Sequence, residues 1–270
     1  LIVSVSNNEN RNRVSALGYS LGYLGGGLLF LVNVIMFLNP QFFGIENQSN
    51  AILISFVMVA FWWAFFSIPI LRNVSESDTQ KEEPRFFKAI LQSFNEVYQT
   101  LMEVRKYKNV AIFLLAYWFY MDGIDTIVRM ATAYGSDIGL EASSMITALI
   151  LTQFVGFPST LIFGYFADKI GFKKIISIGI LIYILISIFA SRITTATEFY
   201  LMAVVVGLVM GGVQAVSRAY FSSIIPEDKE AQFFGFYNLV GKSAVVAGPA
   251  LLAWISMIFN TPRAGILGLL

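Results

Sequence analysis

The 270 residues include no cysteine and no histidine, and only 13% of them are charged. Without cysteine the chain has no disulfide, no thiol nucleophile and no thiolate metal site. Without histidine it has no imidazole base, no Ser–His triad and no HExxH zinc site. Soluble domains carry about a quarter charged residues, so the composition excludes a water-soluble enzyme. We expect neither a metal nor a cofactor.

What the chain has in abundance is apolar surface. Apolar residues make up 57% of the sequence and aromatic residues 15%. This richness excludes a disordered chain. The formal net charge of +1 excludes a nucleic-acid binder with a basic footprint. Residence in a membrane is the class that fits.

A helix that crosses the hydrocarbon core needs roughly 20 mostly apolar residues. Seven segments meet this requirement, and an eighth begins near Ala264 and is cut off. The seven are Val14–Ile45 (with Ala16–Leu38 as its expected core), Ala51–Leu71, Val110–Ala133, Ala142–Ala167, Ile175–Ser191, Phe199–Ile224 and Phe233–Phe259. The sequence therefore predicts an all-α integral membrane protein. Because it starts at Leu1 and stops inside an apolar run, we expect a partial chain.

Basic residues in the loops predict the orientation. Loops on one side hold thirteen Lys and Arg residues, whereas those on the other side hold only Arg192 and Arg263. Cytoplasmic loops carry the excess of basic residues. The N-terminal end is therefore expected in the cytoplasm.

A polar and charged stretch, Val74–Pro84, separates the second span from the third and is typical of a linker. Apolar residues then recur at helical spacing within Arg85–Tyr107, which predicts an amphipathic cytoplasmic helix. They are Phe87, Ile90, Leu91, Phe94, Val97, Tyr98 and Leu101. The helix is either a membrane-surface or gating element or a connector packed under the bundle, and we favour the connector.

The loop between the fourth and fifth spans combines Gly164, Asp168, Gly171, Lys173 and Lys174. The first glycine and the aspartate are four residues apart, so they share a helix face. Glycine allows close approach of a neighbouring helix, and the carboxylate can meet that helix's N-terminal amides or a basic side chain. The combined spacing argues against an ordinary positively charged loop.

This loop resembles the signature of the major facilitator superfamily, although Phe172 stands where a basic residue is common. The resemblance implies twelve spans in two halves, with this copy in the second half, so the chain runs from span five into the start of span twelve. Residues 1–73 are then the last two spans of the N-terminal half, residues 74–109 the cytoplasmic linker, and residues 110–270 the C-terminal half.

Stretches along nearly the whole chain point to one branch. They include Val14–Gly26, Asp122–Thr126, Gly212–Arg218, Phe233–Asn238 and Gly248-Pro249. Together they look like the vacuole-effluxer-like branch, which is related to the autophagy-linked exporter of amino acids from yeast vacuoles. The resemblance implies amino-acid efflux. We expect the protein in the cytoplasmic membrane of a bacterium.

Five charged residues fall inside predicted spans: Asp122, Asp125, Arg129, Lys242 and, near the end of its span, Arg218. Such residues are costly in a bilayer and usually functional. The first three share one face at spacings of 3 and 4, as a cavity-facing proton or substrate site. Alternatively, an Asp125–Arg129 pair only fixes packing. Asp122 lies near mid-membrane by helical rise, which favours function, and we hypothesise that Lys242 is its partner.

Amides and glycines supply the remaining candidates. Gln214 is a substrate-binding candidate, because the first and fourth helices of each half line the cavity in the resembled superfamily, whereas Arg218 is interpreted as a gate or anchor residue. Glycines recurring every four residues predict close helix packing. They are Gly18, Gly22 and Gly26 in the first span and Gly207 and Gly211 in the sixth.

The function predicted is a secondary carrier that moves a small solute by alternating access, with protons at Asp122 as a candidate coupling ion. The expected partners are the lipid bilayer and a small-molecule substrate, with no nucleic acid, and the full-length protein is expected to be a monomer. An intramembrane aspartyl protease also needs two buried carboxylates, but both aspartates here share one helix. A non-transporting membrane sensor is the other alternative.

Overall fold

The computed structural model describes residues 5–7, 9–74, 86–226 and 229–268, with side chains at all of these except 86–94 and 262. Every regular element in these ranges is a helix. The elements are α1 (Arg11–Leu38), the 3-10 helix η1 (Pro40–Phe43), α2 (Gln48–Asn73), α3 (Phe86–Val104), α4 (Lys108–Asp137), α5 (Ala142–Ile170), α6 (Phe172–Ala190), α7 (Ala196–Ile224), α8 (Glu230–Phe259) and α9 (Pro262–Leu267).

Seven of these helices, α1, α2 and α4–α8, are long and apolar enough to cross a membrane. The predicted all-helical membrane fold is therefore confirmed. The expected core of the first span, Ala16–Leu38, lies within α1 and ends with it at Leu38, and the uncharged residues beyond it include η1. Pro40 explains the stop, since proline disfavours helical geometry in the residue before it.

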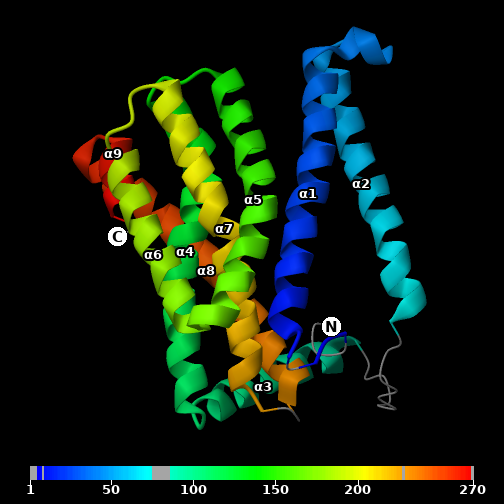
Figure 1. Cartoon of the computed structure of the whole chain (residues 1–270), viewed down its shortest axis with the longest axis vertical. Helices are drawn as coiled ribbons and strands as arrows, with labels where there is room; N and C mark the ends of the chain where they lie inside the picture. Colours follow the sequence, from blue (N-terminus) through cyan, green and yellow to red (C-terminus); the bar gives the residue numbers. More distant parts are fainter. Residues whose placement is uncertain (1–4, 8, 75–85, 227–228, 269–270) are drawn as a thin grey trace. The chain divides into compact units, whose positions relative to one another are not determined.

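The chain divides into two compact units, residues 1–24 with 95–270 and residues 25–94. The larger unit contains α4–α9, the first part of α1 and the end of α3. Its long helices α4–α8 run together as a bundle (Figure 1), in which α5 packs on α7, α4 on α8 and α6 on α7. In the smaller unit, Gly25 of α1 lies against the Trp62 ring of α2, with 3.9 Å from its Cβ position to Cζ2.

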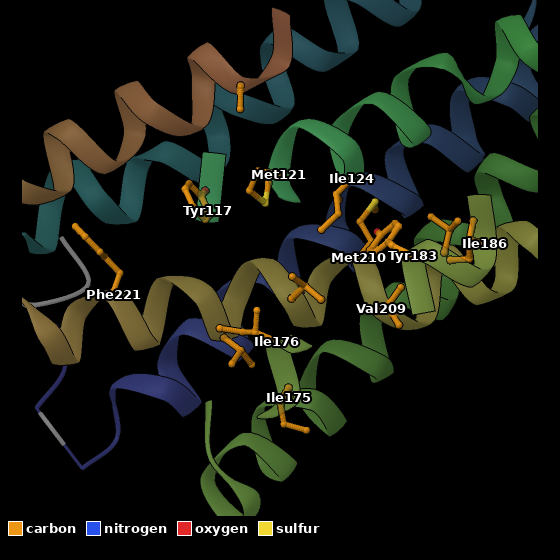
Figure 2. Packing of buried hydrophobic residues seen from close by; sticks show 14 of the residues in the cluster. Tyr117, Met121, Ile124, Ile175, Ile176, Tyr183, Ile186, Val209, Met210 and Phe221 are labelled. Carbon is orange, nitrogen blue, oxygen red and sulfur yellow. The ribbon is translucent and has the colours of Figure 1, made fainter. Parts of the chain in front are cut away.

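The core of the larger unit lies where α4, α6 and α7 meet. Figure 2 shows Ile124, Tyr183 and Met210, one from each helix, gathered in one part of this core. An aromatic stack joins the other end, with the Tyr237 ring 4.3 Å from Tyr117 and 4.7 Å from Phe221 between centroids. These contacts hold α8 to both α4 and α7.

The glycines of α7 lie directly against α5. A Cβ atom at Gly207 would come within 2.8 Å of the Thr152 carbonyl oxygen, and one at Gly211 within 2.1 Å of Thr160 Oγ1. Thr152 Oγ1 also donates a hydrogen bond to the Ala203 carbonyl across this seam, at 3.1 Å. Small residues therefore bring these two helices into backbone contact.

The regularly spaced glycines of α1 differ, and for them close packing stays a prediction. Gly18, Gly22 and Gly26 are exposed, and a Cβ atom at any of them would meet nothing within 4 Å among the residues that the structure describes. Repetition of small residues leaves room for a neighbour, but it does not say whether a described helix fills that room.

The end of α3 packs with a face that the sequence pattern did not single out. Thr100 and Val104 are buried, whereas Val97, Tyr98 and Leu101 of the predicted apolar face are exposed. The side chains of Phe87, Ile90, Leu91 and Phe94, and all of residues 75–84 in the predicted linker, lie outside the described residues.

Candidate functional site

The charged residues of α4 lie in two different environments. Asp122 lines a cavity of about 890 Å³ formed by α4, α6, α8 and Gly268 after α9. Asp125 lies within electrostatic range of Tyr19 and Tyr23 of α1, and Arg129 is exposed. Two side chains three residues apart on an α-helix point about 60° apart around the helix axis. The single face predicted from the spacing therefore divides between two sites.

The partner of Asp122 is a backbone group of α8. The Gly248 N–H donates a hydrogen bond to Asp122 Oδ1 at 2.6 Å. The two ion pairs within the described residues involve neither Asp122 nor Lys242, which is exposed. The hypothesis that Lys242 pairs with Asp122 is therefore wrong. Asp125 and Arg129 do not form an ion pair in this part of the chain either.

The cavity beside Asp122 is largely apolar, with Trp118 and Trp254 in its wall. Its polar groups include Tyr183, whose buried hydroxyl has no hydrogen-bond partner among the described residues, and Ser187, which donates to the Tyr183 carbonyl at 3.1 Å. Its volume falls in the usual range of small-molecule pockets, about 300–1,000 Å³. Its one carboxylate, however, is already engaged by α8.

A second polar cluster joins α1, α4 and α7. Tyr19 lies within electrostatic range of both Arg218 and Asp125. Both charged residues are half-buried, and neither forms an ion pair with any residue that the structure describes. We call Tyr19, Tyr23, Asp125 and Arg218 the α1–α4–α7 cluster. A cation and an anion on different helices thus lie within electrostatic range of the same tyrosine without forming an ion pair.

Gln214 extends this cluster, since it is half-buried on α7 one turn before Arg218 and such residues share a face. Nearby, the Tyr120 hydroxyl donates to Ser217 Oγ at 2.7 Å and links α4 to α7. The sequence interpretation gave Arg218 only a gate or anchor role and missed Tyr19. A signal was present in the repeated Gly-Tyr pairs at positions 18–19 and 22–23 of a charge-free span.

The ring of Tyr23 fixes α1 against α5 and α7. A Cβ atom at Gly211 would lie 2.3 Å from Tyr23 Cε2, and one at Gly156 would lie 3.3 Å from Cδ1. The two glycines thus form a notch for the ring. Ser15 Oγ adds a hydrogen bond to the Ala215 carbonyl at 2.9 Å. These contacts fix the segment of α1 that carries Tyr19.

The predicted signature loop contacts the beginning of α1. Asn12 Nδ2 donates to the Gly164 carbonyl at 2.8 Å and to Asp168 Oδ1 at 2.7 Å. A Cβ atom at Gly164 would lie 2.7 Å from the Ala16 Cβ atom, so glycine allows this approach. Gly171 joins α5 to α6 with φ 96° and ψ 145°, a region in which side chains are strained.

The two lysines of the loop follow at the start of α6. Lys173 Nζ lies 5.8 Å from the ring centroid of Tyr220, within the distance of a cation–π contact. Lys174 is exposed. The pair therefore presents positive charge at the same end of the bundle as the beginning of α1.

Further polar contacts tie α1, α3 and α8 together at this end. Arg11 pairs with Glu230 at 3.5 Å and donates to the Ser222 carbonyl at 3.2 Å. Glu103 of α3 pairs with Lys229. The hydrogen bond from Lys229, and its charge, lower the pKa of Glu103 below the ordinary glutamate value.

Comparisons with known proteins place these features in a family. The family model described as "Vacuole effluxer Atg22 like" matches residues 3–270. An uncharacterized MFS-type transporter, YxiO of Bacillus subtilis, is 36% identical over 270 residues, which cover all of this chain and 62% of that protein. Autophagy-related protein 22 of Kluyveromyces lactis is 24% identical over 263 residues, 90% of this chain and 52% of that protein.

Autophagy-related protein 22 of Yarrowia lipolytica is likewise 24% identical, over 94% of this chain and 47% of its own length. No solved structure matches the chain. The chain thus spans between about half and 62% of these relatives, as expected for a partial chain. The family model covers nearly every residue, and the seven membrane-length helices agree with it. The chain belongs to the Atg22-like vacuole effluxer family of MFS-type transporters.

Proposed function

We propose that the complete protein is a secondary carrier that exports an amino acid by alternating access. The family description, vacuole effluxer, supports outward movement of a solute. The observation that carries the proposal is the α1–α4–α7 cluster, in which Asp125 and Arg218 share Tyr19 without forming an ion pair. Carriers of this kind bind their solute between helices of the two halves, near mid-membrane.

The chemistry of this cluster suits a zwitterion. Asp125 can accept hydrogen bonds from the ammonium group of an amino acid, and the Arg218 guanidinium can bind its carboxylate in a bidentate fashion. Unpaired charges inside a membrane are costly, and a ligand carrying both opposite charges would neutralise both residues. Gln214, one turn from Arg218, would flank the bound solute.

The same proposal assigns the two halves and the gate. Residues 1–73 belong to the N-terminal half, residues 74–109 are the linker, and residues 110–270 belong to the C-terminal half. The bonds from Asn12 to Gly164 and Asp168 then join the two halves at one end. We place this end in the cytoplasm, with Gly171, Lys173 and Lys174 in the gating loop, because basic residues concentrate there.

Protons are the proposed coupling ion, with Asp125 as the titrating group on the solute path, since carboxylates at membrane depth commonly relay protons. The complete protein is proposed to act as a monomer in the cytoplasmic membrane of a bacterium. Arg129 and Lys242 are exposed in the described chain, and we give them no direct contact with the solute.

The test is counterflow of labelled amino acids in proteoliposomes made with the complete reading frame. Asp125→Asn and Arg218→Gln should each lower counterflow by about 10- to 100-fold, because a hydrogen bond to a charged group contributes about 1.5–3 kcal/mol. The exposed Asp137, at the last turn of α4, supplies the control. Asp137→Asn should transport like the wild type at equal membrane levels.

Undiminished counterflow in both site variants would remove the cluster from the mechanism. No counterflow with any amino acid in the wild type would contradict the proposed substrate, and failure with other solutes too would favour the sensor alternative. The intramembrane protease alternative is not supported, because the family is one of transporters. In addition, Asp122 and Asp125 lie on the same helix, whereas the protease needs a carboxylate from each of two helices.

A further inference from the structure

α8 contains a weak point in the middle of its length. Pro249 lies inside this 30-residue helix. It has no N–H to donate, and its ring crowds the carbonyl four residues earlier, at Val245. Proline also disfavours helical geometry in the residue before it, here Gly248. The backbone hydrogen bonding of α8 is therefore impaired at this one step.

Asp122 of α4 meets α8 at this same step. Its Oδ1 accepts the hydrogen bond from the Gly248 N–H. A Cβ atom at Gly248 would lie 2.8 and 3.0 Å from the two carboxylate oxygens and 2.0 Å from Thr126 Oγ1. Only a hydrogen atom fits there. The glycine thus lets the backbone of α8 reach the side chains of α4.

The contact also leaves Thr126 in an unusual state. This residue is fully buried, and its Oγ1 has no hydrogen-bond partner among the described residues. An unpaired buried hydroxyl destabilises the folded protein. The unpaired hydroxyl lies beside Gly248. The packing at this point therefore maintains the close approach of α4 and α8 and not a hydrogen bond of Thr126.

The two parts of α8 on either side of the break are held separately. At its beginning, Glu230 pairs with Arg11 of α1. Beyond the break, a Cβ atom at Gly265 of α9 would lie 2.1 Å from Ser256 Oγ and 2.6 Å from the Leu252 carbonyl oxygen. Each part therefore has its own anchor, and Asp122 holds the point between them.

We infer that Asp122 is a positioning residue. Its carboxylate oxygen accepts the Gly248 N–H, whose own helical bond is weakened where Pro249 disfavours helical geometry, and so holds α8 against α4 at this step. This inference goes beyond the proposed function and does not depend on which solute is carried. It also differs from the hypothesis that Asp122 binds the solute or a proton. A positioning role requires only an acceptor oxygen, whereas a solute or proton site requires a charge or a titratable proton.

Asparagine distinguishes the two assignments. Asp122→Asn keeps an acceptor oxygen at the same place but has neither charge nor titratable proton. A solute or proton site should fail with asparagine as it fails with alanine. A backbone acceptor should tolerate asparagine and fail with alanine. A second discriminating change is Pro249→Ala, which returns the missing N–H to α8 and should make Asp122 dispensable.

The experiment measures the geometry of α8 directly. Leu239 and Met257 are exposed on either side of the break, and 18 residues of helix separate them by about 27 Å. Cysteines placed there in the complete protein, after removal of any cysteine outside these 270 residues, carry spin labels for double electron–electron resonance. The wild type, Asp122→Asn and the surface control Asp137→Ala should give the same narrow distance distribution.

Asp122→Ala should broaden the distribution, and adding Pro249→Ala should make it narrow again. A distribution in Asp122→Ala equal to the wild type, an asparagine variant as broad as alanine, or no effect of Pro249→Ala in the double variant would each overturn the inference. In counterflow of labelled amino acids, asparagine should keep the wild-type rate, whereas alanine should lower the maximal rate with little change in half-saturation. If the wild type moves no amino acid, the distance measurement still decides.

Discussion

Adding one methyl group at Gly207 should loosen the bundle, because this glycine brings α7 against the backbone of α5. In Gly207→Ala the new Cβ atom would lie 2.8 Å from the Thr152 carbonyl oxygen and 3.2 Å from its Cα atom. Ordinary contacts between a carbon and a carbonyl oxygen begin at about 3.3 Å. Since both groups belong to helix backbones, the helices must separate by about 0.5 Å.

The magnitude follows from this separation. Overpacking by one methyl group typically costs about 1–3 kcal/mol. The bond from Thr152 Oγ1 to the Ala203 carbonyl, now 3.1 Å, would lengthen to about 3.6 Å and cease to be a hydrogen bond, a further loss of about 0.6 kcal/mol in a membrane. Alanine regains about 1 kcal/mol of helix propensity. The net loss of stability is about 0.5–2.5 kcal/mol.

The assay is the thermal midpoint of the detergent-solubilised complete protein, followed by tryptophan fluorescence. Gly235 on α8 is the matched control, since a Cβ atom there would meet nothing within 4 Å of the described chain. Gly235→Ala should leave the midpoint unchanged or raise it, because alanine adds up to about 1 kcal/mol of helix propensity. A Gly207→Ala midpoint at or above the wild type would refute the packing argument.

Two further predictions concern the end of the bundle near the beginning of α1. The pair with Lys229 lowers the pKa of Glu103 from 4.5, so its stabilising contribution is complete above that pH and is lost as the pH falls through the lowered value. The midpoints of wild type and Glu103→Gln should differ at neutral pH and converge in strong acid, and a constant difference would contradict this. Gly171→Ala should cost about 1–3 kcal/mol, because its φ of 96° strains any side chain; a midpoint equal to the wild type would count against that strain.

The spans could be predicted because membrane helices are determined locally. In lipid every backbone N–H and carbonyl must be satisfied within its own helix, so a long apolar run is enough to identify one. All seven predicted spans correspond to helices. The expected core of the first span ends at Leu38, where α1 also ends. The signature Gly164, Asp168 and Gly171 was also readable, because its residues lie within one turn and loop.

The partners of the charged residues were not readable from the sequence. Asp122 bonds to a residue 126 positions away, and the residues near Tyr19 come from α4 and α7. A span that is apolar on all sides has no periodic pattern to show which face meets which neighbour. The glycines illustrate the same limit, since Gly207 and Gly211 of α7 meet α5, while the equally regular Gly18, Gly22 and Gly26 of α1 meet nothing among the described residues. The sequence by itself therefore determined which segments cross the membrane and to which family they belong. Only the tertiary packing decided which side chains meet, because side-chain contacts depend on how helices distant in sequence are rotated against one another.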